Sequence, residues 1–487
     1  MKKILLAVAC CAMTLLAQAN PAHKVKINDG LTVSVEACSE SIFRIKVSPR
    51  KDFTESLMER YELIKTDWSD VKTDISDKGG VWTLKTSEYS LAINKKTGVM
   101  TVKDAKGGNV IKEVRFLPEK EELCGTMRAF INEKYADLKV ADNGGGIIGD
   151  DNGKFGEVDK HEIPAADPVS IISLSMENGE RFYGGGSTSR DHIQHRGEFL
   201  RMWTTYQQTE IPMPFMMSSR GWGVYNNSTR KSFFDIGNQQ KSKFNIINTF
   251  DEADFYLMMG KDMPAILNEY TLVTGRTYVL PKWAYGLCFG PNMREEQFDI
   301  LNDAVRFRQF DVPCDVFWLE PQWMEKRYDF STKKKWNYDR FSPEPYWLQD
   351  QYPKTMHNRL FIGKLRSMGF HLGLWLCEEY DLSIQEEDII AERTGGKLSG
   401  QEHWMDHLTV FMDQGVEGFK LDPARTIDNH TNWEYYNGRT DKEMHNLNQV
   451  LLPKQMRELG RKYNGKRTWH HYCGGWSGTQ RWTASTS

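Results

Sequence analysis

The segment QEHWMDHLTVFMDQGVEGFKLD, residues 401–422, decides how this part of the chain folds. Its first half is predicted to be helical up to Gln414, where Gly415 ends the helix. Val416–Leu421 then forms a short, largely apolar run that is typical of a buried strand. Asp422 follows directly. A helix that leads into a buried strand predicts one unit of a parallel α/β sheet.

The same alternation runs from Lys282 to the end of the chain. The other predicted strands are Trp283–Phe289, Cys314–Leu319, Phe370–Leu376 and Arg467–Tyr472, and the helices between them are Arg294–Phe310, Lys354–Met368 and Asp441–Leu459. Five strands at this spacing predict part of a (β/α)8 TIM barrel. An open doubly wound sheet is the alternative, but no glycine-rich phosphate fingerprint follows the first strand. Because a barrel needs eight strands, we expect it to be incomplete here and the natural chain to continue beyond Ser487.

Residues 20–280 have a different pattern, with many short alternating strands and frequent turns, which predicts an N-terminal β-sandwich. Leu31–Val35, Ile42–Val47 and Val81–Ile93 are examples. A helix that Asp262 caps and Gly275 ends closes this domain. The chain is therefore predicted to be multidomain, with a sandwich over 20–280 and a catalytic barrel over 281–487.

Residues 1–19 are interpreted as a secretory signal peptide. Lys2 and Lys3 precede an apolar run from Ile4 to Leu16, and Ala17-Gln18-Ala19 provides a small-x-small cleavage site. The run is too short to span a membrane. Cys10 suggests a lipid anchor as an alternative, but it lies too close to the start to leave an apolar region before it. A secreted or periplasmic protein without membrane insertion is expected.

The composition is that of a globular protein, with 39% hydrophobic and 26% charged residues. A formal net charge of -3 gives no indication of a nucleic-acid or anionic-membrane partner, and a neutral, polar substrate fits it. The 15 Trp suit sugar binding, although tryptophan also fills cores. The cysteines lack metal-ligand spacing. No metal and no organic cofactor are therefore expected.

Carboxylates stand where several predicted strands end. In a barrel, catalytic groups lie at the carboxyl ends of the strands. Those ends carry Glu320, Glu378, Glu379, Asp381 and Asp422, with His470 or His471 at the fifth. Any one of these acids is as easily explained as a solvated loop residue. Their convergence suits glycoside cleavage, because its oxocarbenium-like transition state needs a carboxylate beneath it.

A series of motifs gives a sharper indication. In chain order they are RFYGGG at 181–186, HRGEFLRMW at 195–203, PFMMSSRGWGVYNN at 214–227, YLMMGKDMPAILNEYTLVTGRTYVLPKWAYGL at 256–287, CDVFWLEPQWM at 314–324, VEGFKLDPAR at 416–425, EMHN at 443–446 and GTQRW at 478–482. Their order and spacing resemble glycoside hydrolase family 31. The resemblance covers most of the chain after residue 19, and it implies a retaining α-glycosidase.

The resemblance also implies roles for individual residues. Asp422 would be the nucleophile that forms a covalent glycosyl-enzyme. Lys420 would keep that carboxylate ionised, or form a structural ion pair. Glu320 would bind sugar hydroxyls, and Arg481 would contact the sugar or hold a catalytic carboxylate. The remaining predicted binding residues are Trp318, Trp323 and Trp375, each of which has plain core packing as its alternative, and His471.

Three features depart from the family pattern. Glu320 replaces the common Asp at the second strand and is one methylene longer. Arg425 stands three residues after Asp422, where many members carry an acid; its positive charge would suit a substituted or acidic sugar. The family's acid/base Asp follows the Gln-Arg motif and is expected beyond residue 487, so a catalytically weakened fragment is predicted.

The expected activity is exo-cleavage of α-glucoside- or α-xyloside-like oligosaccharides. An α-galactosidase, an α-N-acetylgalactosaminidase, a lyase or a catalytically silent carbohydrate-binding protein are the alternatives. The sequence leaves the sugar, the linkage and the oligomeric state open.

Overall fold

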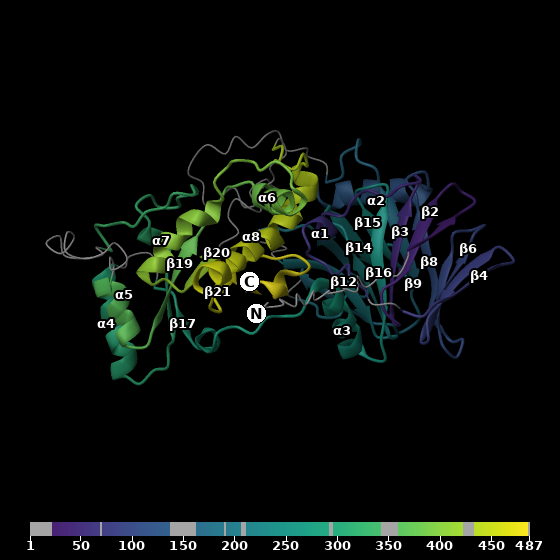
Figure 1. Cartoon of the computed structure of the whole chain (residues 1–487). Coiled ribbons are helices and arrows are strands. Elements are labelled where there is room, and N and C mark those ends of the chain that lie inside the picture. Colours follow the sequence, from purple (N-terminus) through teal and green to yellow (C-terminus); the bar gives the residue numbers. More distant parts are fainter. Residues whose placement is uncertain are drawn as a thin grey trace, which may run out of the picture.

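The structure is a computed structural model that describes residues 22–68, 71–136, 162–188, 191–205, 211–291, 296–341, 359–421 and 433–485. It has two parts (Figure 1): two antiparallel sheets in the purple-to-teal half of the chain, and one parallel sheet with its helices in the green-to-yellow half. The predicted signal peptide, Asp422 and Arg425 lie outside the described residues.

Among the residues that the structure describes, the first sheet has seven antiparallel strands. In spatial order they are β1 (His23–Lys26), β2 (Thr32–Ala37), β3 (Ile42–Ser48), β16 (Ala253–Met259), β13 (Trp222–Asn226), β12 (Ile211–Ser218) and β10 (Phe182–Ser187). Strands β3 and β16 pair with each other, so an early and a late segment of the domain lie side by side in the middle of this sheet.

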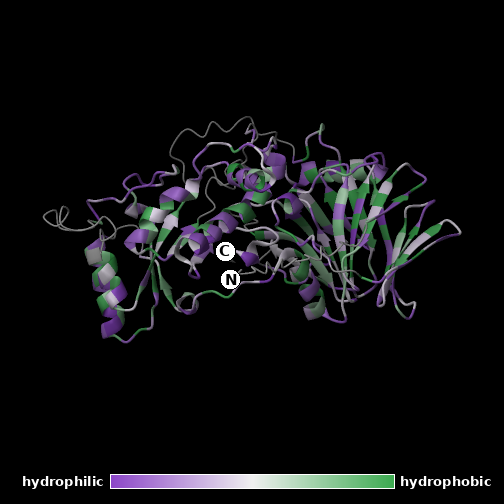
Figure 2. Ribbon diagram, in the orientation of Figure 1, coloured by the Kyte–Doolittle hydropathy of each residue, from purple (hydrophilic) through white to green (hydrophobic). Residues whose placement is uncertain are grey.

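The second sheet has nine antiparallel strands within the described ranges. They are β11 (Phe199–Met202), β14 (Ser232–Ile236), β15 (Lys243–Asn248), β9 (Ser170–Ser175), β8 (Asn109–Leu117), β7 (Met100–Asp104), β6 (Tyr89–Asn94), β5 (Val81–Lys85) and β4 (Asp74–Lys78). Apolar side chains of both sheets, such as Phe43 and Leu91, belong to one buried core. Figure 2 shows hydrophobic residues running through the strands of both sheets. The predicted sandwich is therefore present.

In the described part of the sandwich domain, the α-helices are α1 (Leu57–Arg60), α2 (Glu122–Lys134) and α3 (Met263–Thr274). As predicted, the Asp262 carboxylate caps α3 by accepting from the Ala265 amide, at 2.9 Å. Gly275 ends α3 with φ 98°, in the left-handed region that favours glycine.

The third sheet has six parallel strands among the described residues. In spatial and chain order they are β17 (Cys288–Phe289), β18 (Val316–Leu319), β19 (His371–Leu376), β20 (Gly418–Leu421), β21 (Trp469–Tyr472) and β22 (Ala484–Ser485). The α-helices around them are α4 (Gln297–Gln309), α5 (Arg359–Ser367), α6 (Ser383–Thr394), α7 (Thr409–Gln414) and α8 (Asp441–Asn464). Short 3₁₀ turns are η2 (Lys282–Tyr285), η3 (Pro321–Trp323), η6 (Trp404–Leu408) and η7 (Thr479–Arg481).

None of the described helices is both long and apolar enough to cross a membrane.

Several local predictions need correction. The first barrel strand covers only Cys288–Phe289, because the preceding residues form the 3₁₀ turn η2 after Pro281. Val81–Ile93 is a hairpin of two strands, since the Thr86 hydroxyl accepts the Tyr89 amide and turns the chain. Helices α2 and α6 were not predicted.

Helix α8 joins the two parts of the molecule. The His445 ring stacks on Trp203, with centroids 3.9 Å apart, and its Nε2 lies 2.8 Å from the Thr204 carbonyl oxygen. Further along the helix, Lys454 donates to the Tyr61 carbonyl oxygen at 3.1 Å. A second contact lies between α3 and the residues before η7, where the hydroxyl groups of Tyr270 and Ser477 are 3.2 Å apart.

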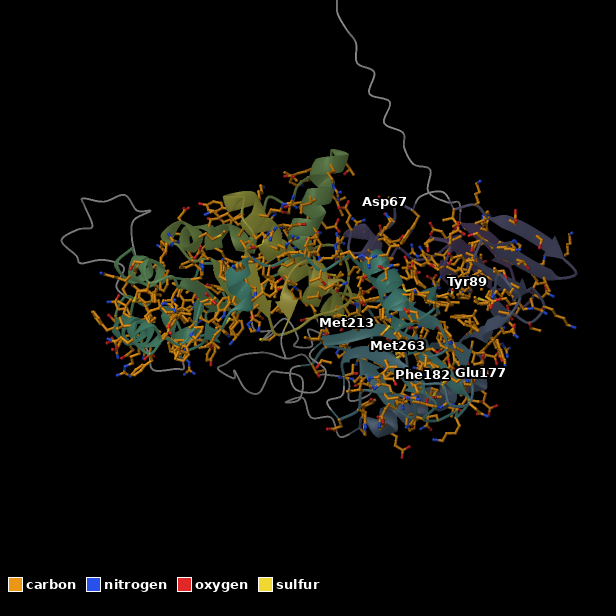
Figure 3. All side chains as sticks on the ribbon, turned by 90° about the horizontal axis from the view of Figure 1, so that it is seen from below. Asp67, Tyr89, Glu177, Phe182, Met213 and Met263 are labelled. Atoms are coloured by element: carbon orange, nitrogen blue, oxygen red, sulfur yellow. The ribbon has the colours of Figure 1, made fainter. Side chains whose placement is uncertain are left out.

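Figure 3 looks at the molecule from below and labels Met213 of β12, whose sulfur accepts a weak hydrogen bond from the same Tyr270 hydroxyl. The sandwich and the parallel sheet are thus connected by buried polar contacts.

Candidate active site

A floor layer of four residues lies across the parallel sheet. Strand register aligns Trp318 with Gly373, Gly373 with Gly418, and Gly418 with Trp469. The Trp318 ring lies against the two glycines: a Cβ built on Gly373 would overlap the ring, and one on Gly418 would lie 3.1 Å from the ring and 2.5 Å from the Trp469 carbonyl oxygen. Glycine is required at Gly373 because the indole fills the space that a side chain would take, and at Gly418 chiefly because the Trp469 carbonyl oxygen lies there. Trp318 is therefore buried beneath the strand ends.

A second row, which we call the rim row, lies two residues further along the strands. It consists of Glu320, Trp375, Lys420 and His471. Register pairs Trp375 with Lys420 and Lys420 with His471, and Glu320 follows Leu319, the partner of Leu374. The sequence placed these residues at separate strand ends, and the sheet brings them together.

The central contact of the rim row is an ion pair. Lys420 Nζ lies 3.0 Å from Glu320 Oε1, and the two side chains are 21% and 23% exposed. They are buried enough to hold one geometry, yet remain accessible to a ligand. Asp422 is two residues beyond Lys420, outside the described residues. The ion pair supports the structural alternative for Lys420, and its role toward Asp422 stays a prediction.

His471 completes the row as a neutral imidazole. Burial, with a further contribution from the Lys420 charge, lowers the pKa of His471 to about 4. The ring stacks parallel to Trp469 at a centroid distance of 6.3 Å. At neutral pH it can therefore donate one hydrogen bond and accept another. His470 points to the helix side and stacks with Phe419; burial lowers its pKa to about 3.

The predicted tryptophan walls differ in position. Trp375 is a member of the rim row, and its ring packs edge-on against Tyr328 at 5.5 Å. Trp323 is fully buried, packs against Phe411 of α7 and donates its Nε1 hydrogen to the Trp375 carbonyl oxygen at 2.8 Å. This burial favours the core alternative for Trp323, which supports the row from behind.

Arg481 lies at the junction with the sandwich. Its guanidinium donates to the Glu62 carbonyl oxygen at 3.0 Å and stacks over Trp482 at 4.5 Å. Its side chain also packs so closely on Gly275 that a Cβ there would overlap it. The structure thus does not bring Arg481 into the rim row, and its sugar contact stays a prediction.

The sequence noted Glu378 only as one of several strand-end acids, and the structure singles it out. This carboxylate follows β19, is 1% exposed and lies 3.6 Å from the equally buried ammonium of Lys334. Burial raises the pKa of Glu378 to about 7, although the Lys334 charge opposes the shift. The neighbouring Asp381 instead anchors the chain, accepting from the Ser383 and Tyr436 amides.

Replacing Glu378 with glutamine is expected to stabilise the protein at high pH. The raised pKa means that protonated Glu378 contributes stability below about pH 4.5, and that this contribution is lost as the pH rises through about 7. Glutamine stays neutral, so Glu378→Gln should gain up to about 3 kcal/mol of unfolding free energy at pH 8 and nothing at pH 4.

Urea unfolding at both pH values measures this difference. The exposed neighbour Glu379 provides the control, because Glu379→Gln should change stability by less than about 0.5 kcal/mol at either pH. An effect of Glu378→Gln that is larger at pH 4 than at pH 8 would contradict the assignment.

The rim row can bind a polyhydroxylated ligand. It offers the Glu320 carboxylate as an acceptor, the Lys420 ammonium as a donor and the neutral His471 imidazole. The Trp375 indole beside them is 2% exposed, so its burial favours the core alternative, as for Trp323. Within the described ranges, no group of three or more His, Cys, Asp or Glu side chains is arranged to hold a metal ion.

Comparison with known protein families matches both parts of the chain. Residues 32–235 match the glycosyl hydrolase 31 N-terminal galactose mutarotase-like domain. Residues 277–486 match the glycosyl hydrolases family 31 TIM-barrel domain. Together they support the predicted order of a β-domain followed by a TIM-barrel domain.

Among curated proteins, an alpha-xylosidase of Emericella nidulans is 23% identical over 330 residues, covering 61% of this chain and 40% of its own. An alpha-xylosidase of Saccharolobus solfataricus is 26% identical over 319 residues, covering 60% of this chain and 40% of its own. The chain thus spans about 40% of the length of these relatives.

Solved structures share the fold. A GH31 dextranase of Flavobacterium johnsoniae in complex with glucose superposes with a TM-score of 0.68 at 18% identity, covering 96% of this chain and 56% of its own. A GH31 alpha-xylosidase from a soil metagenome, in complex with xylose, gives 0.68 at 16% identity, covering 95% and 66%. On the two domain matches and the order of its motifs, the chain belongs to glycoside hydrolase family 31.

Proposed function

We propose that the protein is a retaining α-glycosidase that removes terminal sugars from α-linked oligosaccharides of the xyloside or glucoside type. The observation that carries the proposal is the Glu320–Lys420 ion pair in the rim row, two residues before Asp422. The names of the relatives, two alpha-xylosidases among them, support the substrate class.

In this mechanism the Asp422 carboxylate attacks the anomeric carbon and the bond to the leaving oxygen breaks. The product is a β-linked glycosyl-enzyme, which water then cleaves to regenerate the carboxylate and release the sugar with its original α configuration. Glu320 accepts hydrogen bonds from sugar hydroxyls, and the Lys420 ammonium holds Glu320 in place while favouring a negative charge nearby. His471 contributes a neutral donor. We assign no residue to the acid/base role.

Export is part of the same proposal. Cleavage after Ala19 would release a mature protein that begins at Asn20 and meets its substrate outside the cytoplasm. Mass spectrometry of the mature N-terminus checks this.

A panel of aryl α- and β-glycosides tests the activity in the full-length protein. We expect hydrolysis of one α-glycoside, α-xyloside or α-glucoside, with the α-anomer as the first product in proton NMR. Hydrolysis of an α-galactoside or an α-N-acetylgalactosaminide alone would replace the substrate class but keep the mechanism. Cleavage of β-glycosides alone would overturn the proposal, and a folded protein silent across the panel would favour a carbohydrate-binding role.

A further inference from the structure

A long loop follows strand β18 and begins with a rim-row residue. We call residues 320–341 the β18 loop; Glu320 is its first residue. The chain leaves the sheet and returns at Trp336, which forms an isolated antiparallel bridge with Met324. That bridge closes the loop shortly after Glu320. The position of Glu320 therefore depends on how the β18 loop is fastened to the sheet.

The β18 loop is fastened to the end of the neighbouring strand β19 by its backbone and side chains. Trp323 Nε1 donates to the Trp375 carbonyl oxygen at 2.8 Å. The Cys377 thiol donates a weak hydrogen bond to the Asp329 carbonyl oxygen at 3.4 Å. These contacts join the two ends of the loop's outward half to successive residues of β19 and the turn after it.

An ion pair fastens the returning half of the loop. Lys334 Nζ lies 3.6 Å from Glu378 Oε2, and the two side chains are 2% and 1% exposed. The ammonium also donates to the Ser331 carbonyl oxygen at 2.6 Å, which fixes its place within the loop. The carboxylate belongs to the turn after β19, so the pair ties the loop directly to the strand end.

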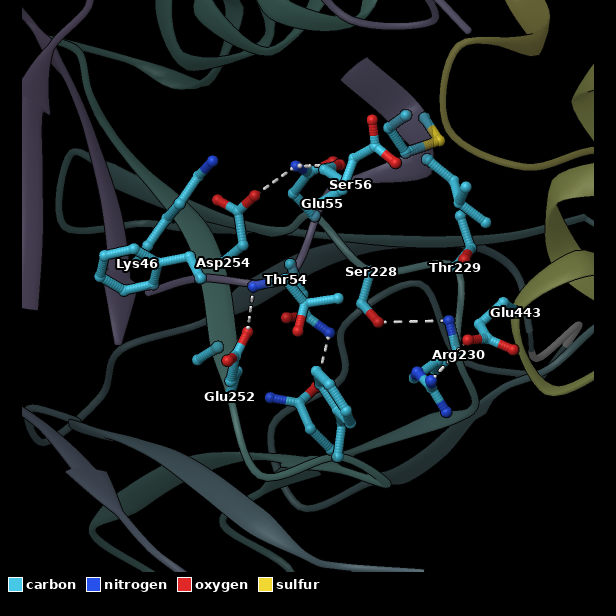
Figure 4. Close-up of a pocket in the computed structure, with 18 of the residues that line it drawn as sticks. Lys46, Thr54, Glu55, Ser56, Ser228, Thr229, Arg230, Glu252, Asp254 and Glu443 are labelled. Atoms are coloured by element: carbon cyan, nitrogen blue, oxygen red, sulfur yellow. Dashed lines mark hydrogen bonds and ion pairs between the residues drawn. The ribbon is translucent and has the colours of Figure 1, made fainter. Parts of the chain in front are cut away.

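Ion pairs elsewhere in the molecule are more open to solvent. A pocket lies where the sandwich meets the start of α8 (Figure 4), and Arg230 and Glu443 pair in its wall at 2.7 Å. Their side chains are 22% and 15% exposed, so water weakens that interaction. Lys334 and Glu378 lack such access. Their attraction is therefore stronger, and it depends more on whether both groups are charged.

The β18 loop also contains a strained residue. Tyr328 has φ 54°, in the left-handed region that aromatic residues rarely adopt. Such a conformation persists only where the surrounding contacts fix it, and it is frequent at active sites and ligand-binding loops. The Tyr328 ring packs edge-on against Trp375 of the rim row. The strained residue thus lies directly beside the candidate site.

We propose that Lys334 and Glu378 are positioning residues, whose ion pair holds the β18 loop, and with it Glu320 and Tyr328, against the end of β19. Both side chains are too deeply buried to touch a sugar, so they act through Glu320. The part of this inference that concerns sugar binding rests on the proposed function. The fastening of the loop does not.

The charge of Glu378 sets how firmly the loop is held. Burial raises the pKa of Glu378 to about 7 against the Lys334 charge, so the ion pair is complete at pH 8, whereas a neutral carboxyl group faces Lys334 at pH 5. The other titratable groups near Glu378 are the exposed Glu379 and Tyr380, whose pKa is raised to about 12 and which stays neutral at both pH values.

Stability and sugar affinity should therefore respond to Glu378 in opposite directions. Ionised Glu378 costs unfolding free energy, because the raised pKa favours the protonated form in the folded protein. The same ionised group fastens the β18 loop through the Lys334 charge, since a charge-assisted contact is stronger than a neutral one. A merely structural role would change stability and affinity in the same direction.

Glu378→Gln is the sharpest variant, because glutamine has nearly the same size and stays neutral at every pH. Combining Lys334→Met with Glu378→Met is the second variant; it removes both charges together and leaves no unpaired charge in the interior. Lys333→Met is the matched control, because Lys333 is on the same loop and its pair with Glu402 is at the surface, with both side chains 68% exposed.

Steady-state kinetics of the full-length protein on an aryl α-glycoside, at pH 5 and pH 8, measure the effect. At pH 8, Glu378→Gln and the double Met variant should raise KM by at least about threefold over wild type, and kcat should stay within about twofold. At pH 5, KM of Glu378→Gln should equal that of wild type. Lys333→Met should leave KM unchanged at both pH values. Urea unfolding at pH 8 should show Glu378→Gln to be no less stable than wild type, which excludes loss of the fold as the cause.

Hydrogen exchange of the loop amides gives a readout that needs no substrate. Residues 320–341 should exchange faster in Glu378→Gln than in wild type at pH 8, and equally fast at pH 5. Equal exchange at pH 8, or the same KM ratio at both pH values, would overturn the positioning role. A folded wild type that cleaves no glycoside would refute the proposed function alone, and the exchange of the loop would then decide whether the ion pair holds it.

Discussion

Asp422→Ala is expected to reduce turnover of an aryl α-glycoside by well over ~10³-fold, since it removes the atom that forms the glycosyl-enzyme. The loss should appear in kcat, because a small side chain at the end of β20 leaves the Glu320–Lys420 contact available for ground-state binding. Steady-state kinetics of the full-length variant measure both parameters.

Azide gives the same variant a positive readout. With the carboxylate gone, a small anion can enter from the β face, so an aryl α-glycoside with a good leaving group should give a β-glycosyl azide. Asp406→Ala is the control, because Asp406 is an exposed acid of the same domain and should leave kcat within twofold. Activity of Asp422→Ala within tenfold of wild type would refute the assignment of the nucleophile.

The rim row could be predicted from the sequence because it depends on one rule. Neighbouring parallel strands have their carboxyl ends at the same edge of the sheet. Glu320, Lys420 and His471 were therefore expected to lie close together once their strands were recognised. The register also aligns Gly373 with Trp318, whose ring fills the space of a side chain at that glycine. Strand position therefore predicted proximity.

What the sequence could not predict depends on long-range packing. Trp323 and Arg481 stand near motif residues, but one turns into the core beside α7 and the other reaches Glu62 of the sandwich. The burial of Glu378 likewise depends on Lys334, 44 positions earlier in the chain. No periodicity signals such contacts.

Gly373→Ala is expected to destabilise the parallel sheet by about 3 kcal/mol or more, which is at the upper end of overpacking effects. The added methyl group would overlap the Trp318 ring, which lies between β19 and the indole of Trp469, 5.0 Å away from it. The ring has no free space to move into, because Trp318 is 4% exposed and the ring atom nearest to Gly418, Cη2, also lies against Gly373. Urea unfolding of the full-length protein measures the loss.

A double-mutant cycle with Trp318→Leu tests the stated cause. Trp318→Leu alone should also destabilise, since it leaves a cavity in the floor layer. Combined with Gly373→Ala, the smaller side chain makes room for the methyl group, so the double variant should be more stable than the sum of the two losses by about 1–3 kcal/mol. Gly125→Ala is the control: Gly125 lies inside α2 with open space around it, and alanine there should add about 0.5–1 kcal/mol. Strict additivity of the two floor-layer substitutions would show that Gly373 is needed for a reason other than the indole. The packing of Trp318 on Gly373 would then no longer explain how the rim row is positioned at the strand ends.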